Sequence, residues 1–217
     1  MISLHTSFLR KVLSRINRAD KPFVYVAIGD SAAEGVGASC HERSYPGIIH
    51  TFLTKHYQSV TFYNFGKRRS PASWVISEQL ERAIELNPDL ITLSVGANDI
   101  RVGNMPWKFE KDLRVLAREL RSKTSATIVI NSIPDFSHVY FIPFFIRPLA
   151  SRIIKKFNGV IEKVANDEGI VFVDLFHNTS IFAKYPEATA KDRFHPSDFG
   201  YALWANSILS ILKLSDK

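Results

Sequence analysis

Ser31 stands where a strand-like apolar stretch runs into a glycine-rich loop, in the segment VAIGDSAAEGVGAS of residues 26–39. A serine hydroxyl becomes a nucleophile when a base, usually histidine, takes its proton and a carboxylate orients that base. Three of the seven histidines lie three residues after an aspartate, in the pairs Asp135/His138, Asp174/His177 and Asp192/His195. These residue types therefore suggest nucleophilic catalysis by serine, with one of three Asp/His pairs as its partner.

The setting of His195 favours the third pair. It lies in DRFHPSDFGY, residues 192–201, where Pro196 fixes a tight turn and a final helical segment anchors it. The two-residue spacer in such a turn lets Asp192 meet the imidazole from its far side, while the other ring nitrogen faces the sheet. His138 and His177 follow predicted strands and stay within reach of the same edge of the sheet.

Serine chemistry on a carbonyl also needs hydrogen-bond donors for the oxyanion that develops. Asn98, in SVGANDI of residues 94–100, offers a side-chain amide after a predicted strand, although the same sequence is an ordinary turn. Gly66, after another strand, offers a backbone N–H or is simply a turn glycine.

The elements that position these residues alternate along the chain. Short apolar runs rich in β-branched residues predict strands, and 3.6-residue periodicity predicts helices between them. The predicted strands are 23–29, 60–65, 90–95, 126–131 and 170–174, and the predicted helices are 45–57, 72–86, 107–123, 149–168 and 197–212. This alternation indicates an α/β fold, a parallel sheet with helices on both faces in the flavodoxin-like order 2-1-3-4-5. Ligands bind such sheets where the order reverses beside the first strand, and Ser31 lies just beyond that strand.

Composition narrows the classes of protein. A chain of 217 residues with 46% hydrophobic content predicts one domain over 1–217 with a full core. One cysteine, Cys40, excludes an internal disulfide, and neither a cofactor nor a metal is expected. The net charge of +7 favours an acidic partner, but the absence of zinc-finger spacing and of long basic runs argues against nucleic acid. Without an apolar run long enough for a membrane span or a signal peptide, we expect a cytoplasmic protein.

Four segments together resemble the SGNH (GDSL-type) hydrolases: GDSAAEGVGA, NFG, GAND and DRFHP, in that order. The resemblance covers nearly the whole chain except the N-terminal helix. It implies a flavodoxin-like fold and hydrolysis of carboxylic esters or thioesters through an acyl-enzyme. By similarity, Ser31 is the nucleophile, His195 the base and Asp192 its orienter, while the Ser31 and Gly66 amides and the Asn98 side chain form the oxyanion hole.

The segment after Gly66 departs from the family pattern. The family continues Gly-x-Ser-Gly, whereas this chain continues Lys67-Arg68-Arg69-Ser70-Pro71. The departure begins directly after the glycine that the resemblance assigns to the oxyanion hole. The three cations form either a solvated basic turn or a rim that prefers substrates carrying a phosphate.

Two apolar segments stand outside the alternating pattern. Residues 3–18 predict an amphipathic basic helix that docks either on its own domain or on a membrane surface or partner. Residues 140–149, YFIPFFIRPL, form either a loop folded into the core or an apolar wall beside the site. In the second case Phe144 and Phe145 would hold the acyl chain.

The sequence as a whole predicts a serine hydrolase that cleaves small-molecule acyl esters, of carboxylesterase, lysophospholipase or thioesterase type. The alternatives are a deacetylase of a sugar or polysaccharide and a non-catalytic binding module on the same scaffold.

Overall fold

The computed structural model describes residues 21–137, 139, 142–177 and 185–212. Five parallel strands form one sheet in the order β2-β1-β3-β4-β5, which confirms the predicted fold. The strands are β1 (Phe23–Gly29), β2 (Val60–Asn64), β3 (Leu90–Ser94), β4 (Thr127–Asn131) and β5 (Val171–Val173). Each lies within one residue or so of its predicted bounds.

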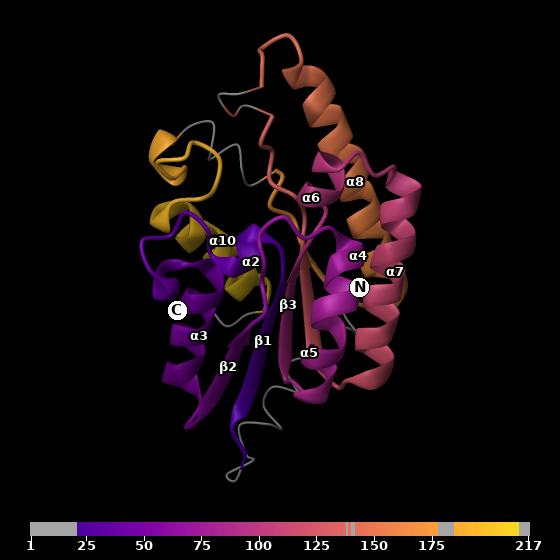
Figure 1. The fold of residues 1–217 in the computed structure, drawn as a ribbon. Helices are drawn as coiled ribbons and strands as arrows, with labels where there is room; N and C mark the ends of the chain where they lie inside the picture. Colours follow the sequence, from indigo (N-terminus) through magenta and orange to yellow (C-terminus); the bar gives the residue numbers. More distant parts are fainter. Residues whose placement is uncertain (1–20, 138, 140–141, 178–184, 213–217) are drawn as a thin grey trace.

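Helices cover both faces of this sheet (Figure 1). On one face α3 (Tyr45–His56) packs against α10 (Asp198–Ile211), and on the other α7 (Pro106–Lys123) packs against α8 (Arg147–Glu168). Alternate residues of the strands feed the two cores, as the pleat requires. Val26, Ile28 and Ile91 are buried on the α7 side, and Tyr25 and Ala27 on the α3 side.

The predicted helix 72–86 is divided into three parts. It runs as α4 (Ala72–Val75), a π-helical turn η2 (Ile76–Leu80) and α5 (Glu81–Glu85). The wide turn brings Gln79 inward, where its side chain is fully buried among apolar residues. A π-turn inside a helix is uncommon and frequently marks a functional region.

Short helices lie at the carboxyl ends of the strands, where the sequence predicted only turns. They are α2 (Ser31–Glu34), after β1, and α6 (Ala97–Arg101), after β3. The 3₁₀ turns η1 (His41–Arg43) and η3 (Pro186–Ala188) complete the described elements. The predicted cap of the last helix is present, because the Ser197 hydroxyl accepts a hydrogen bond from the Gly200 N–H.

The predicted amphipathic helix of residues 3–18 lies outside the described residues. Among the residues that the structure does describe, none of the helices combines the length and the apolar character needed to cross a membrane.

Candidate active site

Ser31 owes its position to a close approach between β1 and β3. Gly29 ends β1 with φ of 133°, and a Cβ on it would come within 2.1 Å of the Ser94 carbonyl oxygen. Only glycine fits both the conformation and the space. Ser31 then occupies the first position of α2, where its N–H has no hydrogen-bond partner among the described residues, as is usual for the first turn of a helix. The geometry leaves this donor available to a ligand.

The buried amide of Gln79 holds the same turn from behind. Its Oε1 accepts the Gly29 N–H at 2.7 Å, and its Nε2 donates to the Gly29 carbonyl at 2.9 Å. The π-turn η2 therefore has an identifiable consequence, because it presents a side chain that pairs with both backbone groups of Gly29. The residue two positions before the serine is fixed by this pair of bonds.

His195 is oriented by Asp192 through the turn predicted from the sequence. Asp192 Oδ2 lies 2.6 Å from His195 Nδ1, and Oδ1 accepts the N–H groups of Phe194 and His195. Burial alone would raise the pKa of Asp192, but the hydrogen bonds from His195 and Phe194 hold it below its usual value. Because the ionised Asp192 can only accept a hydrogen bond, the hydrogen of the neutral His195 ring lies on Nδ1. The lone pair of His195 Nε2 is then available to accept a proton.

The pair Asp174/His177 has nearly the same local geometry but a different environment. Asp174 Oδ2 lies 2.5 Å from His177 Nδ1, and its Oδ1 accepts the His177 N–H. The side chain of His177 is nevertheless 81% exposed, compared with 20% for His195, and it does not line the cavity described next. Three-residue Asp/His spacing thus sets the pairing, while the surrounding elements decide whether the ring faces a site.

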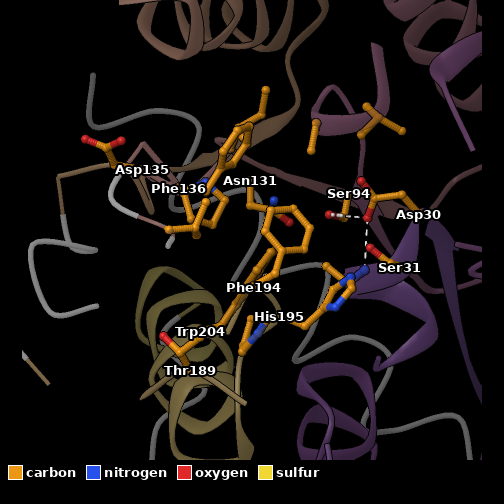
Figure 2. A pocket seen from close by; sticks show the side chains of 17 residues that line it. Asp30, Ser31, Ser94, Asn131, Asp135, Phe136, Thr189, Phe194, His195 and Trp204 are labelled. Carbon is orange, nitrogen blue, oxygen red and sulfur yellow. Dashed lines mark hydrogen bonds between the residues drawn. The ribbon is translucent and has the colours of Figure 1, made fainter. Parts of the chain in front are cut away.

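A small cavity brings Ser31 and His195 together. Both line a partly open cavity of about 90 Å³ beyond the carboxyl ends of the strands, where Figure 2 shows the imidazole lying beside the serine. No hydrogen bond joins the two side chains in the described part of the chain, and such bonds often tighten only once substrate is bound. The rest of the wall is mostly apolar and comes chiefly from Ile133, Phe136, Val139, Phe194 and Trp204.

A buried carboxylate, Asp30, lies directly behind the serine. Its Oδ1 accepts the Ala32 N–H at 3.0 Å and the Ser94 hydroxyl at 3.4 Å, and its Oδ2 accepts the Asn98 amide at 3.4 Å. Burial raises the pKa of Asp30 to about 6, although these three hydrogen bonds oppose the rise. Asp30 therefore links the ends of β1 and β3 and caps the helix that begins at Ser31.

Asn98 is held at both ends of its side-chain amide. Oδ1 accepts the Arg101 Nε at 3.0 Å, while Nδ2 faces Asp30 Oδ2 at 3.4 Å. Arg101 also donates to the Arg69 carbonyl oxygen at 3.4 Å. Asn98 is buried and stands just behind the residues that line the cavity. Since an amide nitrogen carries two hydrogens, one remains for a further acceptor.

Gly66 lies beside the site, but its N–H has another partner. It donates to Asn64 Oδ1 at 2.9 Å. A Cβ on Gly66 would come within 2.3 Å of the Glu34 nitrogen, so this glycine lets the loop after β2 pack onto α2. The structure thus gives Gly66 a packing function and leaves its N–H committed in the absence of ligand.

The three cations after Gly66 are exposed and do not line the cavity. Arg68 is engaged by Glu34, with its Nε and Nη2 3.1 and 2.9 Å from Glu34 Oε1. Burial would raise the pKa of Glu34, but the bonds from Arg68 hold it below its usual value. With Arg68 neutralised in this way, the cluster Lys67-Arg68-Arg69 presents less charge than the sequence suggested.

Phe144 and Phe145 lie away from the cavity. Phe144 is 79% exposed, and both residues stand in the turn before α8, which projects beyond the sheet (Figure 1). The apolar wall is instead formed by residues nearer the end of β4 and by the His195 turn. Asp135 lines the cavity, whereas its predicted partner His138 lies outside the described residues.

Three residues of this site were missed by the sequence analysis. Asp30 was quoted only as part of the glycine-rich motif, and Arg101 was not considered. Gln79 carries a signal that could have been noticed, because it falls on the apolar stripe of the predicted helix between Val75 and Ala83. A polar residue at a buried position has to satisfy its hydrogen bonds inside the protein.

Comparison with known proteins assigns the chain to a family. The model of the GDSL-like lipase/acylhydrolase family matches residues 27–203. The chain belongs to this family. GDSL-like proteins are carboxylic ester hydrolases, and the matched span includes Ser31, Asn98, Asp192 and His195.

Similar proteins within this fold include acetylxylan esterases. An acetylxylan esterase of Geobacillus stearothermophilus is 28% identical in an alignment 138 residues long that covers 59% of this chain and 61% of the relative, so the match spans about three fifths of that protein. The solved structure of Axe2, an acetylxylan esterase from the same organism, has a TM-score of 0.71 at 20% identity and covers 88% of this chain and 94% of its own. LAE5, an alpha/beta hydrolase enzyme from the metagenome of Lake Arreo, has a TM-score of 0.73 at 18% identity, with coverage of 90% and 97%.

Proposed function

We propose that this chain removes small acyl groups, with acetyl as the best fit, from the hydroxyl groups of sugars. The observation that carries the proposal is the meeting of Ser31 and an Asp192-oriented His195 at one small apolar cavity. An alcohol, a base of the correct tautomer and a cavity for an acyl group are the elements that ester hydrolysis through an acyl-enzyme needs.

The reaction would proceed in two steps at the same histidine. Ser31 Oγ attacks the ester carbonyl while its proton passes to His195 Nε2, and the imidazolium returns that proton to the departing sugar oxygen. A water molecule, deprotonated by the same Nε2, then attacks the acyl-serine and releases the carboxylic acid and the free hydroxyl of Ser31. Asp192 stabilises the imidazolium formed in each step.

The negative charge of each tetrahedral intermediate would be stabilised by two donors. One is the N–H of Ser31, at the start of α2, and the other is the second hydrogen of Asn98 Nδ2. The Gly66 N–H would join them only by leaving Asn64 Oδ1. Donors fixed before the substrate arrives stabilise the developing charge without reorganisation at the moment of reaction.

The size of the cavity supports a short acyl group. A volume of about 90 Å³ corresponds to about three water molecules, each taking about 30 Å³ in the liquid. An acetyl group, with three non-hydrogen atoms, fits such a space, whereas a longer acyl chain would have to extend through the open side of the cavity. The similarity to acetylxylan esterases supports the same substrate class, and catalytic mutants of Axe2 in which a serine or a histidine is replaced by alanine support the roles of Ser31 and His195.

Aryl esters of increasing acyl length, compared with an acetylated xylo-oligosaccharide, test this proposal. The expected kcat/KM is highest for acetate and falls steeply beyond propionate, and acetate is released from the sugar. Ser31→Ala should abolish both activities while the melting temperature stays unchanged. A preference for octanoate over acetate would contradict the proposed substrate class, and full activity of Ser31→Ala would contradict the mechanism.

A further inference from the structure

We propose that a second, open groove beside the catalytic turn binds a neutral sugar chain, an inference that rests on the proposed deacetylation. The segment 189–198 lines both hollows. Phe194, His195 and Pro196 face the catalytic cavity, whereas Lys191 and Asp192 face the groove. Thr189 lines both, so the two spaces adjoin. The groove has a volume of about 660 Å³, within the range of about 300–1,000 Å³ typical of ligand sites.

The charge of the groove selects against acidic ligands. Its lining contains three carboxylates, Glu187, Asp192 and Asp198, and one cation, Lys191. Two hydrogen bonds from Ser39 lower the pKa of Asp198, which keeps it ionised at neutral pH. Arg43 also lies near enough to Asp198 to help lower this pKa, so the groove keeps only a small excess of negative charge, in a chain whose net charge is +7. Phosphate-bearing or carboxylate-bearing substrates would be repelled here.

The same carboxylates suit a ligand rich in hydroxyl groups. An ionised carboxylate has about four lone-pair positions, and Ser39 occupies only part of this capacity at Asp198. The hydroxyl group of Thr189 adds a donor and an acceptor along the same wall, whereas the Ser197 hydroxyl already donates to the Glu187 carbonyl and accepts the Gly200 N–H. A neutral polyhydroxyl compound can donate to these oxygens without bringing an opposing charge.

One exposed aromatic ring lines the groove, and a second packs against the first. Phe199, which lines it, is 43% exposed, and Tyr185 is 45% exposed. Their ring centroids are 6.2 Å apart and the rings meet nearly edge to face, at 78°. Aromatic faces offer apolar area at little conformational cost, and the C–H faces of a pyranose can pack against them. Rings beside carboxylates and hydroxyls thus provide both kinds of contact that a saccharide needs.

Kinetics with acetylated xylo-oligosaccharides of two to six units provide the test. In the wild-type protein kcat/KM should rise with chain length as more units reach the groove. The double variant Phe199→Ala/Tyr185→Ala should raise KM for the longest substrate roughly five- to tenfold, as for removal of central aromatic contacts. Its kcat and KM for p-nitrophenyl acetate should stay nearly unchanged. Tyr63→Ala is the matched control, because Tyr63 is also partly exposed but lies on the edge strand β2, outside both hollows.

Binding without chemistry separates this inference from the proposed function. Unacetylated xylotetraose should bind the wild-type protein in a calorimetric titration and bind the double variant more weakly by the same factor. Binding by a protein that hydrolyses no ester would support the groove and contradict the function. Hydrolysis of p-nitrophenyl acetate without any binding of xylotetraose, or an unaltered chain-length series in the double variant, would overturn the groove.

Discussion

Asn98 has a side-chain amide whose orientation is fixed by two neighbours, Arg101 at Oδ1 and Asp30 at Nδ2. An oxyanion donor acts on the charge that develops in the transition state, so its loss should affect kcat far more than KM. Asn98→Ala should lower kcat for p-nitrophenyl acetate about 10²–10³-fold with a modest change in KM. An unchanged kcat in steady-state assays would remove Asn98 from the oxyanion hole.

Arg101 should act through Asn98 rather than on the substrate. Removing its Nε–H frees the amide to rotate, so Arg101→Ala should lower kcat roughly tenfold while KM stays constant, a loss equivalent to about one hydrogen bond. Arg101→Lys, which restores a donor, should recover part of the loss. Arg118→Ala is the control, because Arg118 pairs with Glu168 on the outer helices. Equal decreases of kcat in Arg101→Ala and Arg118→Ala would indicate a general effect of charge instead of the positioning of Asn98.

Local motifs explain why the residues that meet at the cavity could be predicted from the sequence. Ser31 and the Asp192/His195 turn depend on residues within a few positions of each other, and the structure brings both to one cavity. The hydrogen bond from the Gly66 N–H to Asn64 is equally local. It could not be predicted, because the identity of a residue does not indicate which acceptor its backbone N–H meets. Asp30 and Gln79 act across long sequence separations, which one chain does not reveal. Arg101 lies only three residues after Asn98, but an arginine at this spacing on a short turn has no distinguishing pattern.

The elements around the serine depend on a single irregular turn. η2 places Gln79 against Gly29, and the Gly29 carbonyl keeps a second donor, the Lys67 N–H, at 3.0 Å. Gln79→Ala therefore leaves chiefly the buried Gly29 N–H without a partner. The free energy of unfolding should fall by about 1–3 kcal/mol in urea titrations.

Ser77→Ala in the same turn provides the comparison. Ser77 is exposed, and its hydroxyl bonds only the Trp74 carbonyl, so its removal should change stability by less than about 0.5 kcal/mol. A similar loss in both variants would show that the π-turn itself, rather than the Gln79 pairing, is sensitive to substitution.

The alternation of elements was predictable because each strand and helix carries its own periodicity. Sheet order and the site at the carboxyl ends of the strands followed from it. The π-turn could not be predicted from this periodicity, since a helix with one extra residue per turn has nearly the same apolar pattern. The exposed position of Phe144 also could not be derived, because apolar composition does not distinguish a surface turn from a pocket wall.

At the scale of the whole molecule, Asp30 makes stability depend on pH. Its pKa is about 6 in the folded protein, compared with 3.8 for an ordinary aspartate side chain. Because the folded value is the higher one, the native state favours the protonated form, and this contribution to stability is lost as the pH rises through 6. The rise in pKa corresponds to roughly 3 kcal/mol.

Asp30→Asn mimics the neutral carboxyl and should remove this dependence. The free energy of unfolding of the variant, minus that of the wild type, should increase from pH 4 to pH 8 by up to about 3 kcal/mol in urea titrations. Asp112→Asn, at a carboxylate paired with Lys108 on the helix surface, should show no comparable increase. A difference that falls with pH would mean that Asp30 is stabilised as a carboxylate.

Labelling with a fluorophosphonate, followed by mass spectrometry of peptides, tests most directly whether Ser31 is a nucleophile activated by His195. The probe reacts only with an activated serine. We expect a single adduct on Ser31 in the wild-type protein and none in Ser31→Ala. The labelling rate should fall by several orders of magnitude in His195→Ala and stay at the wild-type value in His177→Ala. Labelling of a different serine, or undiminished labelling of His195→Ala, would contradict this assignment.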